Sequence, residues 1–345
     1  MNRVMTGNSP RCSIVIRAYN EGQHLGRLLS GITQQTLDDC EIILVDSGST
    51  DNTVDIAQSY DARIVHIQPE EFTFGRSLNL GIEHAQGELI VLASAHIYPV
   101  YPDWLEHLLA PFIDPQVALT YGKQRGAPDT HFSEHQVFAR WFPDHSQAWQ
   151  AHPFCNNANA AVRRALWQQQ PYDETLPGLE DLAWATEILK KGFAISYVAE
   201  AEIIHVHNEL PRQVFNRYRR EAIAFKRIFP HEQFHLIDFL RLYLTNVISD
   251  FWHAARQRAP WRRLGSIFWF RRMQFWGTYM GYRHSGPLTW QLRQTFYYPH
   301  SLTTRGSNQT RRVQPIQYDD VINPYAVSNE TYGADRHPTP GTSDR

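Results

Sequence analysis

The stretch SIVIRAYNEG at residues 13–22 decides the fold, because a short apolar run leads directly into a polar turn. Such a run, bounded by turn residues, is typical of a buried strand in a parallel sheet. The pattern returns as EIILVD at 41–46, ARIVHI at 62–67 and ELIVLA at 88–93, with helical periodicity between the runs. This alternation predicts an α/β fold: a Rossmann-like, mostly parallel sheet with flanking helices.

Further elements are expected along the same half of the chain. We predict helices at 21–35, 52–60, 75–84, 102–112 and 180–191, strands at 117–121 and 159–162, and an extended segment at 194–207. Residues 126–153 are rich in histidine, proline and aromatic residues without a clear period, which predicts a long loop.

The pattern changes after Pro211, where long helices carry arginine, tryptophan and tyrosine together, at 213–229, 234–255 and 262–282. Beyond residue 300 the chain is polar, with Asn, Thr, Gly and Pro throughout, as is typical of disorder. We therefore expect an α/β domain that carries the functional site at 1–211, a basic, aromatic-rich helical region at 212–300 and a disordered tail at 301–345.

The net charge of -2 conceals a strong division between the two halves. Residues 1–211 hold 13 Lys and Arg against 26 Asp and Glu, whereas residues 212–313 hold 18 against 4. This asymmetry suggests that the second part faces something anionic. Arginine and tryptophan on helices fit a surface for anionic lipids, and packing against the chain's own acidic half is an equal alternative. No nucleic-acid partner is expected.

Three scattered cysteines show no metal or disulfide spacing, and no run of about 18 apolar residues predicts a membrane-spanning helix. These features favour a cytoplasmic protein. Attachment to the inner face of the cell membrane would then be peripheral.

Ligands of open α/β sheets bind beyond the carboxyl ends of the strands, so the residues after each strand are candidate site residues. No GxGxxG follows the first strand, which disfavours NAD or FAD. Carboxylates there, such as Glu21 and Asp46, can instead accept hydrogen bonds from a uracil or thymine N3–H and from ribose hydroxyls. Asp51 is better explained as a helix cap.

Five segments in order, AYNEG, VDSGSTDNT, FTFGRSLNLGIEHAQGE, SAHIYP and GLEDLAWATEILKKG, resemble the signatures of family 2 glycosyltransferases with the GT-A fold. The resemblance covers roughly residues 12–210. It implies transfer of a sugar, with inversion, from a UDP-, GDP- or dTDP-linked donor to a hydroxyl of a glycan or lipid-linked acceptor, in polysaccharide or glycolipid assembly.

The resemblance also implies where the donor binds. Tyr19, Glu21 and Asp46 would surround the base and ribose, within a donor site formed by Ala18, Tyr19, Glu21, Asp46, Ser47, Arg76, Asn79, Ser94 and Ala95. The phrase FTFGRSLNLG is similar to one in the rhamnosyltransferase-like branch. Arg76 and Asn79 could equally form a solvated helix edge, since they lie one turn apart.

Asp181, in Leu179-Glu180-Asp181, is the expected catalytic base, with Glu180 orienting it. An inverting transfer needs a base within hydrogen-bond reach of the acceptor hydroxyl, opposite the leaving nucleotide. The alternative is that both carboxylates only cap a helix and interact with its dipole.

The sequence departs from the family pattern at the end of the fourth strand, where Ser94-Ala95-His96 replaces the usual Asp-x-Asp that binds a divalent cation. Histidine is a competent ligand for Mn²⁺ and a poor one for Mg²⁺. His96 could therefore hold the cation or contact the diphosphate itself. His207 matches a metal-binding histidine of some relatives, and His205 would share its face of the strand. Their alternative is an ordinary role as polar strand residues.

The missing carboxylate leaves two rival functions open. One is a catalytically inactive homologue that only binds nucleotide sugars. The other is a nucleotidyltransferase, for which a Gly-rich loop with Lys or Arg should follow the first strand, and AYNEG lacks that character.

Overall fold

The computed structural model describes residues 9–207, 209–258, 261–283, 313–316 and 318. Its centre is one eight-stranded sheet in the order β3-β2-β1-β4-β7-β6-β8-β5. The strands are β1 (Cys12–Ala18), β2 (Cys40–Asp46), β3 (Arg63–His66), β4 (Leu89–Ser94), β5 (Ile97–Pro99), β6 (Val117–Gly126), β7 (Asn159–Arg163) and β8 (Ala194–His205). The mixed α/β sheet confirms the predicted fold class.

Strands β3, β2, β1 and β4 pair in parallel, so their carboxyl ends lie along one edge. The register sets Ala18 beside Asp46 and Arg17 beside Ser94. Strand β7 is antiparallel to both neighbours, and β8 is parallel to β6. The turns after β1, β2 and β4 therefore meet at one place, as the sequence predicted.

Helices cover both faces of the sheet because its strands alternate apolar side chains toward each face. The helices of this part are α1 (Leu25–Thr33), α2 (Thr53–Ser59), α3 (Phe74–Glu83), α4 (Trp104–Leu109), α5 (Phe132–Trp141), α6 (Arg164–Gln169) and α7 (Glu180–Lys190). One core joins Ile14 and Ile16 to α1, α2 and α4. The other joins Val15 to α3, α5, α6 and α7.

The prediction of a long loop at 126–153 is wrong, because helix α5 lies within this segment. This helix buries Phe132, Val137 and Phe138, but it also buries Glu134 and Gln136. Because polar side chains also lie on the inward face, the apolar residues alone do not show the helical period in the sequence. The short elements β5 and α6 were not predicted either.

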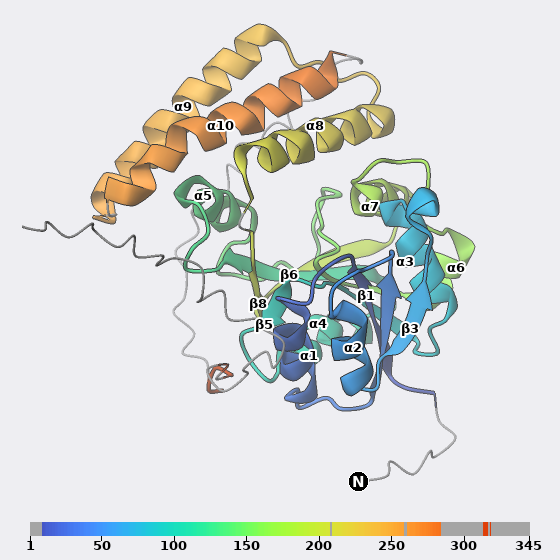
Figure 1. The fold of residues 1–345 in the computed structure, drawn as a ribbon. Coiled ribbons are helices and arrows are strands. Elements are labelled where there is room, and N and C mark those ends of the chain that lie inside the picture. Colours follow the sequence, from blue (N-terminus) through green and yellow to red (C-terminus); the bar gives the residue numbers. More distant parts are fainter. Residues whose placement is uncertain (1–8, 208, 259–260, 284–312, 317, 319–345) are drawn as a thin grey trace, which may run out of the picture.

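Three long helices form a layer beside the α/β part: α8 (Pro211–Ile228), α9 (Leu236–Arg256) and α10 (Trp261–Tyr282). Figure 1 shows this layer stacked over α5 and α7. Helices α8 and α10 approach closely at Gly277, where an added Cβ would lie 2.5 Å from the carbonyl oxygen of Phe215. Leu182 of α7 packs into the apolar cluster of these helices, which joins the layer to the α/β part.

None of the helices in the described ranges is long and apolar enough to cross a membrane. Most of the tail predicted to be disordered lies outside the described residues. Its described residues correct the prediction locally: Ile316 donates its N–H to the carbonyl of Val100 over 2.9 Å, and the Tyr318 hydroxyl donates to the carbonyl of Pro99.

Candidate functional site

A cavity of about 610 Å³ lies beyond the carboxyl ends of β1 and β4. Its walls come from distant parts of the chain, including Arg17 of β1, Phe138 of α5 and Asp181 of α7. Helix α8 supplies a further wall, which includes Arg217 and Arg220. The cavity therefore lies between the α/β part and the helical layer, and both contribute charged groups to it.

Asp181 is one of the buried acids of this cavity. The left-handed backbone of Leu179, with φ 56°, turns the chain so that α7 begins with Glu180 and Asp181. Asp181 accepts hydrogen bonds from the backbone N–H groups of Asn157, over 3.1 Å, and Leu182, over 2.8 Å. Burial, with the neighbouring charge of Glu180, raises the pKa of Asp181 to about 7. A carboxylate with such a pKa is suited to proton transfer near neutral pH.

Glu180 is held in place by groups on two other segments. Its Oε1 accepts a hydrogen bond from Arg17 over 3.3 Å and from the Asn157 side chain over 3.4 Å. The Arg17 guanidinium also donates to the carbonyl of Phe74 and lies 4.8 Å above the ring of that residue. Glu180 and Asp181 therefore line one cavity with Arg17 of β1, and their roles as orienting residue and base stay predictions.

Three imidazoles meet in the lining of the same cavity. The ligand nitrogens of His96, His205 and His207 all lie within 4.8 Å of one another. His205 shares a hydrogen bond between its Nδ1 and Gln124 Oε1 over 2.8 Å, while its buried Nε2 has no partner among the described protein atoms. Because Gln124 Oε1 can only accept, Nδ1 carries the proton and Nε2 keeps its lone pair.

Burial, with the nearby His207 and His96, holds the pKa of His205 well below its ordinary value. His205 is therefore neutral at physiological pH, as a metal ligand must be. The three nitrogen donors of this cluster could hold a divalent transition-metal cation, and they suit Mn²⁺ better than Mg²⁺, which prefers oxygen ligands.

Carboxylates orient the other two imidazoles. His96 Nδ1 lies 2.8 Å from Glu21 Oε1, and its Nε2 lies 3.2 Å from Ser94 Oγ. His207 Nδ1 lies 2.7 Å from Glu134 Oε1. Glu21 thus supports the imidazole cluster in this structure, whereas the resemblance placed it beside the base and ribose.

Glu134 is the site residue that sequence analysis missed most clearly. Its Oε1 also accepts from Arg217 of α8 over 2.6 Å. Burial opposes ionisation, yet Arg217 and His207 together lower the pKa of Glu134 to about 2. Glu134 also belongs to a second possible metal group, with His207 and Glu209. Arg17 was missed as well, although a charge inside the apolar run SIVIRA was a visible signal.

The residues predicted to bind the nucleoside lie at the ends of β1 and β2. Asp46 is buried and accepts from the backbone N–H groups of Gly48, over 3.1 Å, and Ser49, over 3.2 Å. Ser47 Oγ donates to the carbonyl of Ala18 over 3.1 Å, and Tyr19 is largely exposed. Tyr19 is thus free to stack on a base, and the nucleoside role of these residues stays a prediction.

The structure does not support the predicted place of Asn79 in the donor site. Its amide nitrogen donates to the Tyr172 carbonyl and to Glu174, each over 2.9 Å, and its oxygen accepts from Trp167 and from the Tyr172 N–H. This buried amide has no capacity left for a donor sugar.

Three further residues expected at the donor are placed differently by the structure. Arg76 pairs with Glu174 over 3.4 Å and with Glu71 over 3.7 Å, and it does not line the cavity. Ala18 and Ala95 pack into the core, so their side chains are not available to a ligand.

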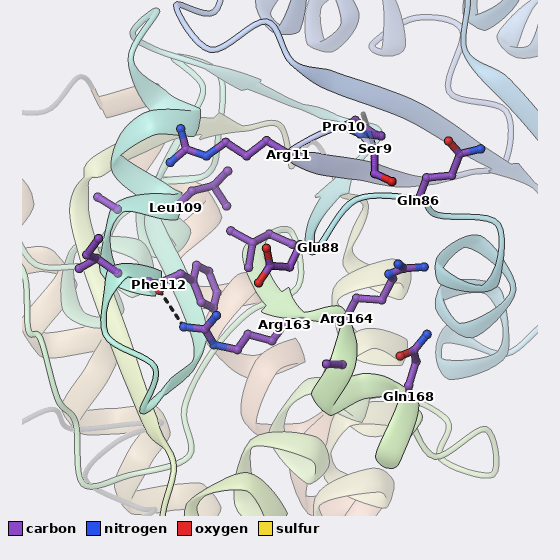
Figure 2. Close-up of a pocket in the computed structure, with 14 residues that line it drawn as sticks. Ser9, Pro10, Arg11, Gln86, Glu88, Leu109, Phe112, Arg163, Arg164 and Gln168 are labelled. Atoms are coloured by element: carbon purple, nitrogen blue, oxygen red, sulfur yellow. Dashed lines mark hydrogen bonds between the residues drawn. The ribbon is translucent and has the colours of Figure 1, made fainter. Parts of the chain in front are cut away.

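A second cavity, of about 780 Å³, lies at the amino ends of β1 and β4 (Figure 2). Its best-placed cation, Arg163, donates to the carbonyl oxygens of Phe112, Asp114 and Val117. The Arg164 guanidinium donates to the Ala85 carbonyl. These cations are used in holding the backbone, so the cavity lacks the chemistry of the first one.

Comparison with known proteins agrees with this geometry. Residues 13–169 match the family model described as Glycosyl transferase family 2. The O-antigen chain rhamnosyltransferase RfbN of Salmonella typhimurium is 28% identical over 222 residues, which cover 60% of this chain and 70% of that protein. The O-antigen chain rhamnosyltransferase WbaN of Salmonella anatum is 29% identical over 223 residues, which cover 61% and 70%.

Among solved structures, a mannosyltransferase of Pyrobaculum calidifontis, PcManGT, in complex with GDP-Man and Mn²⁺, superposes with a TM-score of 0.53. The two chains are 20% identical, and the match covers 80% of this chain and 85% of that one. This likeness supports the GT-A fold.

Proposed function

We propose that this chain is a family 2 glycosyltransferase, as the family match of residues 13–169 supports. The proposed enzyme transfers a sugar with inversion from a nucleoside-diphosphate donor to an acceptor hydroxyl. The observation that carries this proposal is the buried Asp181, whose pKa of about 7 suits a general base, facing the same cavity as the imidazole cluster. Asp181 takes the hydroxyl proton as the acceptor oxygen bonds to the anomeric carbon. The bond from that carbon to the diphosphate oxygen breaks, and the nucleoside diphosphate leaves.

The acceptor class follows from the relatives. Two O-antigen chain rhamnosyltransferases match 60% and 61% of this chain. Their names support a glycan or lipid-linked acceptor in polysaccharide assembly and a deoxyhexose donor. We also propose that residues 1–211 form the catalytic domain and residues 212–300 an appended helical region.

This function is tested by a panel of UDP-, GDP- and dTDP-sugars, scored by thermal shift and by transfer to a glycan acceptor, with and without Mn²⁺. A ligand that binds the folded state raises the unfolding temperature, so the correct donor should stand out. Binding without release of nucleoside diphosphate would indicate an inactive homologue. Release of pyrophosphate with formation of a nucleotide bond would indicate a nucleotidyltransferase.

We propose that His96, His205 and His207 hold a divalent cation, preferably Mn²⁺ over Mg²⁺. PcManGT, named above with Mn²⁺, shares the fold and supports a cation in this region. A cation there would offset the charge of the leaving diphosphate. Glu21 and Glu134 would fix the imidazole orientations from behind.

His96→Ala should weaken Mn²⁺ binding by at least about tenfold, because it removes one of three nitrogen ligands. Calorimetric titration of Mn²⁺ into the nucleotide-free protein measures this, and transfer assays with Mn²⁺, Mg²⁺ and EDTA complement it. His84→Ala is the matched control, since His84 is exposed and lies outside the cavity. If His96→Ala retains both the metal affinity and the metal response, then His96 has no role in cation binding.

We propose that the enzyme attaches peripherally to the inner face of a cell membrane through α9. One face of this helix exposes large apolar side chains at four-residue spacing: Leu236, Leu240, Leu244, Ile248 and Trp252. Exposed Arg241 and Arg256 flank them, and Arg256 lies 3.8 Å above the Trp252 ring. Apolar side chains bordered by arginines match the chemistry of an anionic lipid surface.

Vesicles containing anionic lipid should therefore bind the protein, and binding should weaken as salt rises. Ile248→Glu should reduce the partition coefficient by about tenfold or more, because a buried aliphatic side chain contributes about 1.5–3 kcal/mol. Ile113→Glu is the control, since Ile113 is equally apolar, 93% exposed and distant in sequence from α9. Equal partition onto neutral and anionic vesicles would contradict the electrostatic part.

A further inference from the structure

Arg220 differs from the other arginines of the catalytic cavity. Arg17 is paired with Glu180, and Arg217 is paired with Glu134 and Glu209. Within the described part of the chain, Arg220 forms no ion pair, and this distinguishes it from Arg17 and Arg217. Its buried Nε has no hydrogen-bond partner, as is also true of Arg217 Nε. Burying an arginine N–H without a hydrogen-bond acceptor carries a free-energy cost. The guanidinium of Arg220 is therefore suited to a ligand that supplies a hydrogen-bond acceptor.

The guanidinium of Arg220 is nevertheless held in place. It lies 4.6 Å above the ring of Phe74, and Arg17 lies 4.8 Å from the centre of the same ring. A cation stacked on an aromatic face is stabilised by the ring quadrupole and keeps its in-plane N–H groups free. Phe74 therefore orients Arg220 without using its hydrogen-bond donors.

Arg220 lies beside the segment that carries the base. An added Cβ at Gly178 would be 3.6 Å from Arg220 Nε, and Gly178 comes three residues before Asp181. The proposed nucleoside residues Asp46 and Ser47 are absent from the lining of this cavity. In an inverting transfer the base faces the acceptor, opposite the leaving nucleotide, so a cation next to the base faces the acceptor as well.

We infer that Arg220 binds an anionic group, a phosphate or a carboxylate, on the acceptor. This inference rests on the proposed function, because it takes Asp181 to mark the acceptor side. The planar guanidinium can form two parallel charge-assisted hydrogen bonds with either oxyanion. Arg220 thereby selects an anionic acceptor over a neutral glycan.

The test fills the donor site with a saturating nucleoside diphosphate and then titrates inorganic pyrophosphate or glucuronate by calorimetry. The wild-type protein should bind one of these anions in addition to the nucleotide. Arg220→Gln should weaken that second binding by about 10–100-fold, as expected for a lost charged hydrogen bond of about 1.5–3 kcal/mol. Nucleoside diphosphate affinity should stay within about twofold. The two probes distinguish a phosphate-bearing acceptor from a carboxylate-bearing one.

Arg212→Gln is the matched control, because Arg212 is exposed in the first turn of the same helix and does not line the cavity. Arg220→Lys keeps the charge and should retain part of the affinity, which covers the case in which the glutamine variant folds poorly.

Equal weakening of nucleotide binding in Arg220→Gln would assign Arg220 to the donor and overturn the inference. Second-anion binding that is absent, or unchanged by the substitution, would also overturn it and leave the proposed function standing. Failure of the wild-type protein to bind any nucleoside diphosphate would contradict the proposed function itself, and the acceptor assignment with it.

Discussion

Asp181→Asn is expected to lower the rate of sugar transfer by roughly 10²–10⁴-fold, the usual contribution of a general base, while donor affinity stays within a few-fold. The asparagine keeps the shape of the side chain but cannot take the acceptor proton. Initial rates of transfer and the Kd of the nucleoside diphosphate measure the two quantities separately. Glu187→Gln, an exposed carboxylate on the same helix, should leave both unchanged. Transfer within a few-fold of wild type would exclude Asp181 as the base.

The pH profile gives an independent signature of the same residue. Because burial and Glu180 raise the pKa of Asp181 to about 7, the ionised base accumulates only as pH rises through 7, and the wild-type rate should rise with it. An acid with a raised pKa in the folded state also makes the folded state bind more protons between about pH 4 and 7. Ionising Asp181 therefore costs stability as pH rises through this window. The free energy of unfolding of wild type should therefore fall, relative to that of Asp181→Asn, as pH rises from about 4 to 7.

Much of the fold could be predicted because its buried strands are short apolar runs. SIVIRA and EIILVD are found as β1 and β2 within one residue of the predicted limits. The failure at α5 has a physical cause. Glu134 faces inward because Arg217, 83 residues later, and His207, 73 residues later, compensate its charge. A rule that assigns polar residues to the surface cannot anticipate partners that only the tertiary fold supplies.

Part of the candidate site could also be predicted from the sequence, and part of it could not. Alternation along a strand predicted that His205 and His207 share a face, and their ring centres are 4.0 Å apart. Their joint role stays a prediction. Asn79 was misplaced because a motif position says nothing of how many hydrogen bonds the fold has already formed. Arg217 and Arg220 could not be predicted, since nothing local to α8 indicates that it covers the cavity.

The basic residues of the second half were predicted to face either a membrane or the acidic half of the chain, and the structure shows arginines on the cavity wall as well as on an exposed surface. Arg217 and Arg220 point into the cavity against the acidic half, as one alternative expected. Arg241 and Arg256 remain exposed beside the apolar face of α9 and stay available to a membrane surface. The arginines of the helical layer therefore lie on two surfaces, the wall of the cavity and the exposed side of α9.

Asp250→Ala is expected to destabilise the protein by about 3–5 kcal/mol, which would make it the most damaging single change in the helical layer. Asp250 of α9 and Arg271 of α10 are buried and joined by two hydrogen bonds, of 2.7 and 2.8 Å. Arg271 also donates to the Ser133 carbonyl of α5 over 3.2 Å, so the pair connects the layer to the α/β part. Removing the carboxylate leaves a buried guanidinium without its counter-charge.

Urea unfolding followed by tryptophan fluorescence measures the loss, and Asp129→Ala, on an exposed carboxylate, is the control. The double variant Asp250→Leu with Arg271→Met should recover most of the lost stability, because it removes both charges and their desolvation cost together. The single variant should also lose transfer activity at temperatures below its unfolding midpoint, because α10 supports α8, which carries Arg217 and Arg220. A single variant as stable as Asp129→Ala would show that the pair contributes nothing to joining the two parts.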